Sequence, residues 1–427
     1  MSIMNAMNSG VSGLSAEGDA LGIVGDNVAN SSTVGFKQSR AVFEDVLGGA
    51  VGAEPSVGNG VRLARSQQIF AQGSLQNTGL ATDIALSGDG FFVVQGTVDG
   101  VTGNFFTRAG QSTLRNDGTL VSAQGLALQG YAAKGDGTFE STLGPMVVPT
   151  AALSPKVTST ISVTSNFDAT STVPTAAWDP QNPSTTSNFS TTIRTYDSLG
   201  TAHDVDIHFR KTGNGTWEYH ALAAGSEVQG GTGGQSTEVG TGTLTFTTAG
   251  ALQATTGSIQ VDFVGATAGQ TVALDFGKTI AQGGSGFGGS SQFGAPSNVT
   301  AQSQDGYSSG DFSQLKIESD GTVAGVYTNG QRVDIGKLAV AKFRSNDGLA
   351  RTGHNMWVET SASGEPAIGE AASGGRGGVV AGALEQSNVD IAAQFVELIA
   401  RQRSFQANSK TITTANEMLQ EVTNLKR

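Results

Sequence analysis

The sequence contains no cysteine. This absence excludes disulfides, thiolate nucleophiles and cysteine-ligated metal or iron–sulfur centres. Charged residues are also scarce at 14%, against about a quarter in an ordinary globular protein, and 24 Lys and Arg against 36 Asp and Glu give a formal net charge of −12. Because proteins bind nucleic-acid phosphates through clustered Lys and Arg, we expect no nucleic-acid partner.

Long apolar runs are missing as well. No stretch approaches the roughly 18 to 20 apolar residues that span a bilayer, so we expect no membrane insertion. A cleaved signal peptide begins with a basic region followed by an apolar run, but the first 30 residues contain no Lys or Arg and interrupt their apolar residues with Gly, Ser and Asn. The sequence therefore predicts a protein that stays in the cytoplasm or is exported with its N-terminus intact.

Glycine is the residue present in most obvious excess. The 61 glycines among 427 residues are about double the average usage, while 37% of the residues are hydrophobic and include 20 Phe. This much apolar side chain is enough to offset chain entropy, so the chain is not expected to be disordered. The balance is typical of a turn-rich β protein.

Both ends of the chain repeat apolar residues every seven positions, which is the spacing of helices that pack side by side. In the first segment the repeat consists of Met7, Leu14, Leu21 and Val28, with Met4 and Val11 at the partner position. In the last segment it consists of Ile391, Leu398, Phe405, Ile412 and Leu419, flanked by Phe395. We therefore expect two amphipathic helices that pair as a coiled coil, the second one capped by Ser387 or Asn388.

Each predicted helix has a second row of heptad positions, and this row is only weakly apolar. Gly18 and Gly25 each cost about 1 kcal/mol of helix propensity relative to Ala. The corresponding stripe of the last segment consists of Gln402, Ser409 and Asn416. Two alternatives follow from the periodicity: a monomer whose end helices pair once, and a subunit whose helices need further copies of the chain.

The interior of the chain has short alternating runs bounded by Asn-Gly and Asp-Gly turns, the pattern of antiparallel hairpins. Linkers rich in Pro, Ser, Thr or Gly at 148–159, 172–190 and 282–291 bracket a central insert. The expected fold class is mainly β with α-helical termini, in which terminal coiled-coil helices carry two or more outer antiparallel β domains, the central one inserted in the first. The expected segments are an N-terminal core helix (1–30), a connecting segment (31–70), the first β domain in two parts (71–145 and 294–375), the inserted outer β region (146–293), and a linker with the C-terminal core helix (376–427).

No residue pattern points to catalysis, a metal or a cofactor. The four histidines (His203, His208, His220 and His354) form no recognisable catalytic signature. The spacing of Gly284, Gly286 and Gly289 imitates a dinucleotide-binding motif but lacks the preceding strand and the following helix, so a Gly/Ser linker explains it better. We expect a protein without enzymatic activity and without cofactors.

Three ordered blocks carry a family resemblance. Residues 29–37 read Ala-Asn-Ser-Ser-Thr-Val-Gly-Phe-Lys, and residues 83–92 read Asp-Ile-Ala-Leu-Ser-Gly-Asp-Gly-Phe-Phe, followed by Thr-Arg-Ala-Gly at 107–110. The last block comprises Leu-Glu-Gln-Ser-Asn-Val-Asp at 384–390 and Gln-Arg-Ser-Phe-Gln-Ala-Asn-Ser-Lys at 402–410. The blocks resemble those of the bacterial flagellar rod and hook axial protein family. The residues that match the family motifs are Ala29, Asn30, Gly35, Phe36, Lys37, Ser387, Asn388, Gln402, Arg403, Gln406, Ala407 and Asn408.

The resemblance implies a structural subunit of the flagellar hook, because distal rod proteins of the family generally lack so large a central insert. Such a subunit polymerises into a flexible tubular universal joint that transmits motor torque from rod to filament. The implied polymerisation core consists of the heptad residues named above. The implied location is outside the cell on the basal body, after export without cleavage, and the implied partners are further copies, the distal rod protein, the hook cap protein, the hook-filament junction protein and the flagellar type III export apparatus. The alternatives are a distal rod subunit and a secreted β-rich binding module or enzyme.

Overall fold

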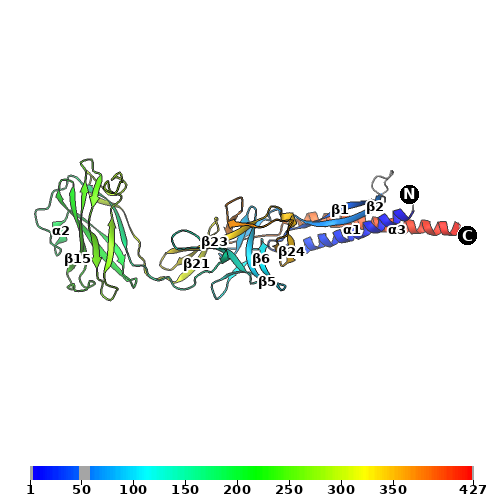
Figure 1. The fold of residues 1–427 in the computed structure, drawn as a ribbon, viewed down its shortest axis with the longest axis horizontal. Helices are drawn as coiled ribbons and strands as arrows, with labels where there is room; N and C mark the ends of the chain where they lie inside the picture. Colours follow the sequence, from blue (N-terminus) through cyan, green and yellow to red (C-terminus); the bar gives the residue numbers. More distant parts are fainter. Residues whose placement is uncertain (1–2, 48–57, 426–427) are drawn as a thin grey trace. The chain divides into compact units, whose positions relative to one another are not determined.

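The computed structural model describes residues 3–47 and 58–425, and the chain forms two compact units (Figure 1). Unit 1 comprises Met1–Thr150, Gln314–Val326 and Arg332–Arg427, so both ends of the chain belong to it. Unit 2 comprises Ala151–Ser313 and Tyr327–Gln331. Unit 2 therefore continues past residue 293, where the insert expected from the sequence ends.

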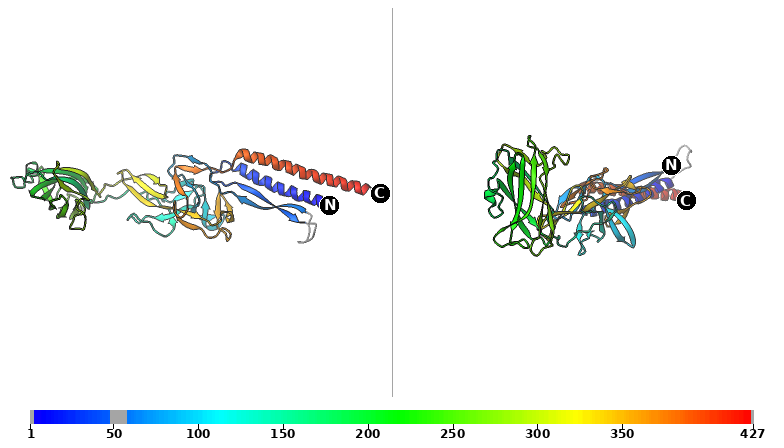
Figure 2. Two further views of the ribbon diagram at one scale, coloured as in Figure 1. Left: turned by 90° about the horizontal axis from the view of Figure 1, so that it is seen from above. Right: turned by 60° about the vertical axis from the view of Figure 1, so that its left-hand side comes forward.

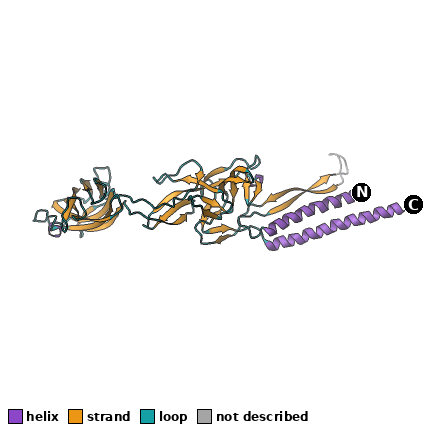
Figure 3. Cartoon of the chain, turned by 90° about the horizontal axis from the view of Figure 1, so that it is seen from below, coloured by secondary structure: helices purple, strands orange, loops and turns teal. Residues whose placement is uncertain are grey.

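Two long helices form the ends of unit 1. α1 (Ile3–Ala29) and α3 (Ile391–Leu425) lie side by side, and a two-stranded β-ribbon runs along α1 (Figure 2). The ribbon pairs β1 (Ser39–Leu47) with β2 (Gly58–Gln68) in antiparallel register. Figure 3 shows the two helices with the strands of the β-ribbon beside them.

Asp390 caps α3, because its Oδ1 accepts the N–H of Ala393 at 3.1 Å. A carboxylate at this position satisfies one of the unpaired N–H groups of the first turn and complements the positive end of the helix. The expectation that Ser387 or Asn388 caps the helix is therefore wrong. Asn388 instead bonds to the chain near the β-ribbon.

The centre of unit 1 is a β-sheet with the strand path β21-β22-β23-β9-β5-β6-β25-β24. The strands of this sheet and those attached to it are β5 (Phe91–Val98), β6 (Val101–Thr107), β7 (Ser112–Leu114), β8 (Leu120–Ser122), β9 (Ala127–Ala132), β10 (Gly144–Pro145), β21 (Phe312–Ile317), β22 (Thr322–Tyr327), β23 (Arg332–Lys342), β24 (Ala350–Gly353), β25 (Met356–Val358) and β26 (Ala367–Glu370). Apolar side chains on both faces of the sheet are buried. The expected turns are present, since Gly118 and Gly330 adopt φ values of +82° and +78°.

Two further strand pairs in unit 1 join segments that are far apart in the sequence. β3 (Leu75–Asn77) pairs with β28 (Ala383–Glu385), and β4 (Ile84–Ser87) pairs with β27 (Gly378–Ala381). Both pairs are antiparallel. They bring the segment that leads into α3 next to the segment that follows the β-ribbon.

Unit 2 is built on a second sheet with the strand path β12-β13-β14-β15-β17-β18-β11-β19. Its strands are β11 (Thr160–Asp168), β12 (Phe189–Tyr196), β13 (Ala202–Gly213), β14 (Thr216–Ala224), β15 (Ser236–Phe246), β16 (Leu252–Thr255), β17 (Ser258–Val261), β18 (Gln270–Asp275), β19 (Ser291–Phe293) and β20 (Asn298–Gln304), and a short helix α2 (Pro183–Thr186) precedes β12. Phe167 lies at the centre of the core, with ring centroids 5.2 Å from Phe209 and 5.1 Å from Trp217. Edge-to-face contacts of this kind stabilise a core beyond simple burial.

The Gly/Ser run at 282–291 is not the linker that the sequence predicts. A Cβ atom at Gly289 would lie 2.3 Å from the carbonyl oxygen of Phe276, and the N–H of Leu252 donates to the carbonyl of Gly286 at 2.9 Å. Glycine is needed here because the run packs directly on the backbone of unit 2. The fold class itself, mainly β with helical termini and more than one β domain, is confirmed.

Candidate assembly surfaces and the junction that holds them

A buried cluster of three charged side chains, termed the buried junction, consists of Lys37, Arg108 and Glu385. Lys37 Nζ lies 2.5 Å from Glu385 Oε1, and Arg108 Nη1 lies 3.2 Å from Glu385 Oε2. The side chains of Lys37 and Glu385 are 0% exposed, and that of Arg108 is 5% exposed. Lys37 follows α1, Arg108 follows β6, and Glu385 ends β28, so the buried junction joins both chain ends to the sheet of unit 1.

Hydrogen bonds compensate for much of the burial of these charges. Taking a charge out of water costs several kcal/mol unless opposite charges and hydrogen bonds replace the solvent. Lys37 Nζ also donates to the carbonyl of Ala71 at 2.7 Å, and the N–H of Gly73 donates to Glu385 Oε1 at 2.9 Å. Burial lowers the pKa of Lys37, and attraction to the Glu385 carboxylate offsets part of that effect. The arrangement is therefore favourable only while all of its charges are present.

Gly35 allows the chain after α1 to approach the buried junction. Its N–H donates to the carbonyl oxygen of Glu385 at 2.7 Å, and its φ is +71°. A Cβ atom at this position would lie 2.6 Å from the backbone nitrogen of Ala109. Both the positive φ and the close backbone contact require glycine, which explains this motif residue physically.

Two asparagine side chains connect the helices to the β-ribbon. Asn27 Nδ2 donates to Gln394 Oε1 at 3.0 Å, and Asn27 Oδ1 accepts the N–H of Ser39 at 2.8 Å. Asn388 Oδ1 accepts the N–H of Gln38 at 2.8 Å, and its Nδ2 donates to two carbonyls that follow β2 at 2.8 and 3.0 Å. Because an amide both donates and accepts, Asn27 connects the backbone of Ser39 with the side chain of Gln394, and Asn388 connects two backbone segments.

Arg401 holds α3 against α1 and the β-ribbon. Its guanidinium lies 3.5 Å from Glu17 Oε2 on α1 and 3.1 Å from Glu397 Oε1 on α3. The same group lies 4.9 Å from the ring centroid of Phe43 on β1. Arginine can satisfy carboxylates and stack on an aromatic ring together, so one side chain links three elements.

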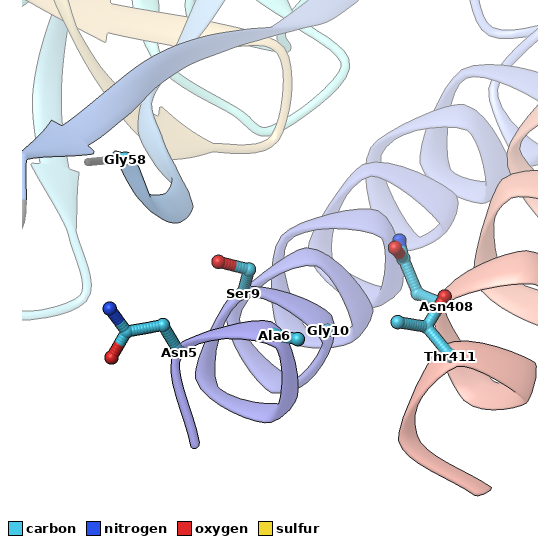
Figure 4. Close-up of a pocket in the computed structure, with 7 residues that line it drawn as sticks. All are labelled: Asn5, Ala6, Ser9, Gly10, Gly58, Asn408 and Thr411. Atoms are coloured by element: carbon cyan, nitrogen blue, oxygen red, sulfur yellow. The ribbon is translucent and has the colours of Figure 1, made fainter. Parts of the chain in front are cut away.

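The two helices approach each other through glycines of α1. A Cβ atom added at Gly10 would lie 3.0 Å from Ile412 Cγ1, and one added at Gly13 would lie 2.8 Å from Asn408 Nδ2. Larger side chains on this face of α1 would push α3 away. Next to this contact a cavity of about 230 Å³ opens between the two helices and the start of β2, lined by Asn5, Ala6, Ser9, Gly10, Gly58, Asn408 and Thr411 (Figure 4).

The pairing of α1 with α3 covers the heptad residues only in part. Met4 and Val11 are 56% and 52% exposed, and Ile391 and Phe395 are 47% and 50% exposed. The remaining heptad residues are half-buried: Met7, Leu14, Leu21, Val28, Leu398, Phe405, Ile412 and Leu419. Their assignment to a polymerisation core stays a prediction, and their exposed area is available to other molecules.

The motif residues divide between the buried junction and the surface of α3. Gly35, Phe36 and Lys37 are buried, and Ser387 and Asn388 are half-buried beside them, while Ala29 ends α1 and Asn30 follows it. On α3, Asn408 is half-buried against α1, and Gln402, Arg403, Gln406 and Ala407 are exposed. The motifs thus mark both a structural centre and an outward face.

Sequence reasoning missed Arg108 and Glu385 as the partners of Lys37. Glu385 is the one charged residue between Gly378 and Val389. A lone carboxylate in such a stretch, directly after the apolar Ala383 and Leu384, is a usable signal for a buried ion pair. Only the folded structure shows that its partners are Lys37 and Arg108.

Within residues 3–47 and 58–425, no group of three or more His, Asp or Glu side chains is arranged to hold a metal ion. The helices of this part of the chain include none that is both long and apolar enough to cross a bilayer.

Family profiles match four parts of the chain. They are the flagella basal body rod protein (7–37), the D1 domain of flagellar hook protein FlgE/F/G (85–166), the D2 domain of flagellar basal body protein FlaE (166–307) and the C-terminal region of the flagellar basal body rod proteins FlgEFG (380–425). The second and third profiles cover strands of unit 1 and of unit 2. The first and last cover the two long helices.

Curated relatives match over nearly the full length. The flagellar hook protein FlgE of Salmonella typhimurium (strain LT2) is 36% identical across 97% of this chain and 98% of its own. FlgE of Escherichia coli (strain K12) is 34% identical across 99% and 100%, and FlgE of Treponema pallidum (strain Nichols) is 34% identical across 100% of both chains. The crystal structure of Helicobacter pylori flagellar hook protein FlgE2 shares the fold, with a TM-score of 0.52, 16% identity, and coverage of 71% of this chain and 98% of that one. Because these relatives are more than 30% identical to this chain over nearly its full length, the chain belongs to the flagellar hook protein family.

Proposed function

We propose that this chain is a structural subunit of the bacterial flagellar hook. Copies of it polymerise through α1 and α3 into a flexible tube that serves as a universal joint between rod and filament. The tube transmits the torque of the motor while it bends. Membership of the flagellar hook protein family supports self-polymerisation within the flagellum. The exposed apolar surface of the helices supports polymerisation through α1 and α3.

The exposed apolar side chains of α3 are the observation that carries this proposal. Ile391, Phe395, Val396 and Ile399 are 47%, 50%, 69% and 50% exposed. Fully burying one such side chain stabilises an assembly by about 1.5 to 3 kcal/mol relative to leaving it in water. Neighbouring subunits that cover these residues therefore gain a large part of the free energy of polymerisation.

The buried junction supports the mechanical part of the role. It ties the chain next to both helices to one sheet through charged groups that are nearly inaccessible to water. A force applied to the helices is therefore passed to the sheet of unit 1 through a packed contact rather than a flexible tether. This is the property that a torque-bearing subunit requires.

The test compares the assembly of the full chain with that of a variant lacking Ile391–Arg427. We expect tubular polymers in electron micrographs of the full chain and none from the truncated variant. The unfolding transition of unit 2 serves as the control, because unit 2 contains no residue of the deleted segment. Polymers formed by the truncated variant would overturn the role of α3.

A distal rod subunit is the alternative favoured by a specific observation. Profiles of basal body rod proteins match 7–37 and 380–425, the two helical ends. Electron microscopy of basal bodies from a strain lacking the gene separates the two functions. Complete rods without a hook support the hook subunit, whereas truncated rods assign the chain to the distal rod.

The remaining parts of the proposal concern location and neighbours. The subunit is exported by the flagellar type III apparatus without cleavage and lies outside the cell, in the hook attached to the basal body. Its neighbours there are further copies, the distal rod protein, the hook cap protein and the hook-filament junction protein. No catalytic step forms part of this role.

A further inference from the structure

We propose that one copy of this chain binds the next head to tail, with an apolar ridge at the start of α3 seated in a groove near the end of α3 of the neighbouring copy. The inference rests on the proposed polymerisation and specifies where two copies touch. Both surfaces belong to unit 1.

The ridge consists of Ile391, Phe395, Val396 and Ile399. Residues at positions i, i+4 and i+8 of a helix lie along one side, so Ile391, Phe395 and Ile399 form a row, with Val396 beside it. All four side chains are at least 47% exposed. The row projects from the helix on the part of α3 next to the cap at Asp390.

The groove has a volume of about 400 Å³ and is lined by Ala6, Ala407, Lys410, Thr411, Thr414, Ala415 and Met418. It shares Ala6 and Thr411 with the cavity of Figure 4, so the two depressions continue one another. Ala415 is only 1% exposed, whereas Met418 is 47% exposed. Methionine adapts its shape to an apolar partner, which suits a wall that receives aromatic and branched side chains.

The charges around ridge and groove identify a second copy as the occupant. Asp390 and Arg403 lie at the two ends of the ridge, and Lys410 and Glu421 lie beside the groove, all four exposed. When two α3 helices run parallel with an offset of about 19 residues, or about 28 Å at 1.5 Å per residue, Asp390 meets Lys410 and Arg403 meets Glu421. An antiparallel arrangement would place like charges together, and like charges across an interface suppress that arrangement.

The ridge and the groove are two different surfaces, and this explains why the polymer can grow at its ends instead of closing on itself. Ridge and groove lie at different positions on one helix, so each copy can use both at once. A contact between two different surfaces is heterologous, and it produces a helical filament when the rotation does not close a ring. The inferred contact is therefore of the kind that a tube requires.

Disulfide trapping tests the contact in the full-length protein. The chain has no cysteine, so Ile399→Cys together with Met418→Cys introduces the only two thiols. Within one copy these positions are about 28 Å apart along the helix, far beyond the roughly 7 Å between Cα atoms that a disulfide allows. Oxidation of the assembled polymer is expected to give a ladder of multimers on a non-reducing gel.

The matched control is Ser404→Cys together with Thr423→Cys, which keeps the offset but uses a different side of α3. It is expected to give no ladder. Polymers of the Ile399→Cys, Met418→Cys variant without a ladder would overturn the ridge-and-groove contact and leave polymerisation itself intact. Absence of polymers from the unmodified chain would instead count against the proposed function.

Charge reversal provides a second measurement that introduces no thiol. Arg403→Glu and Glu421→Arg are each expected to raise the protein concentration needed for assembly roughly threefold to tenfold. The double variant is expected to return close to the unmodified value, because the ion pair is restored in reverse. A double variant as defective as the singles would contradict the parallel offset.

Discussion

Replacing Glu385 by Gln removes the carboxylate of the buried junction while preserving its shape. Lys37 and Arg108 then remain buried without a negative partner, and Lys37 Nζ retains the carbonyl of Ala71 at 2.7 Å as an acceptor. Removing one partner of a buried ion pair costs about 3 to 5 kcal/mol, because the other charge is left uncompensated. For a unit of this size each kcal/mol lowers the melting temperature by about 2 to 4 °C, so the unit 1 transition is expected to fall by about 6 to 20 °C.

Thermal unfolding followed by tryptophan fluorescence can separate this effect from general damage. Trp357 is buried in unit 1, and Trp217 is buried in unit 2, so the unit 2 transition serves as an internal reference. Glu359→Gln is the matched control, since it makes the same chemical change at an exposed position and is expected to alter stability by less than about 0.5 kcal/mol. A loss of less than about 1 kcal/mol for Glu385→Gln would refute the reasoning about the buried junction.

Three further predictions concern single positions. Gly35→Ala is expected to destabilise unit 1 by about 2 kcal/mol or more in urea unfolding, because the alanine Cβ opposes both the positive φ and the nearby backbone, and an unchanged midpoint would contradict this. Burial alone would raise the pKa of Asp305, but hydrogen bonds led by that from Ser159 outweigh it and hold the pKa well below its usual range, so this carboxylate stabilises unit 2 above about pH 4 and the contribution is lost in acid. Asp305→Asn should therefore flatten the acid limb of the stability curve of unit 2, and an unchanged limb would count against it. Burial raises the pKa of Tyr219 to about 12, so the stability it confers below about pH 10 is lost as the pH rises toward 12. Tyr219→Phe should remove that alkaline loss, as measured by unfolding across this range, and a persistent loss would refute the assignment.

The helical ends could be predicted because large apolar side chains recur every seven residues. The face of α1 that contacts α3 could not be predicted in the same way. That face carries Gly10 and Gly13, which contribute nothing to a hydrophobic pattern and yet permit the closest approach of the two backbones. Periodicity identified the rows of Met and Leu, which remain half-buried or exposed in a single copy.

On α3, the heptad pattern placed the second row of contact residues at Gln402, Ser409 and Asn416, and the structure covers a different row. Arg401, Asn408 and Ala415 are covered or half-buried, whereas Gln402 and Asn416 are exposed and only Ser409 of the expected row is half-buried. The covered row lies one residue earlier along the helix. α3 contacts two partners, α1 and, through Arg401, Phe43 of the β-ribbon, so a pattern that assumes one partner misplaces the edge of the contact.

The buried junction lay beyond sequence reasoning for a different reason. Its motif residues Gly35 and Lys37 could be named from the resemblance, but their roles depend on a carboxylate 348 positions from Lys37. Local patterns do not specify contacts at this separation. The strand pairs that bring the two segments together, β3 with β28 and β4 with β27, are each only three or four residues long and give no strong signal of their own.

The long separation within the buried junction has a consequence for the order of folding. The ion pair between Lys37 and Glu385 closes a loop that contains most of the chain. Contacts between residues so far apart in the sequence form slowly. Unit 2 is nearly contiguous, from Ala151 to Ser313, so most of its strand pairs need only their own stretch of sequence. A chain that emerges one end first can therefore fold most of unit 2 while the other end is still missing. The two helices, whose adjoining segments this ion pair connects, are therefore expected to be fixed in place last.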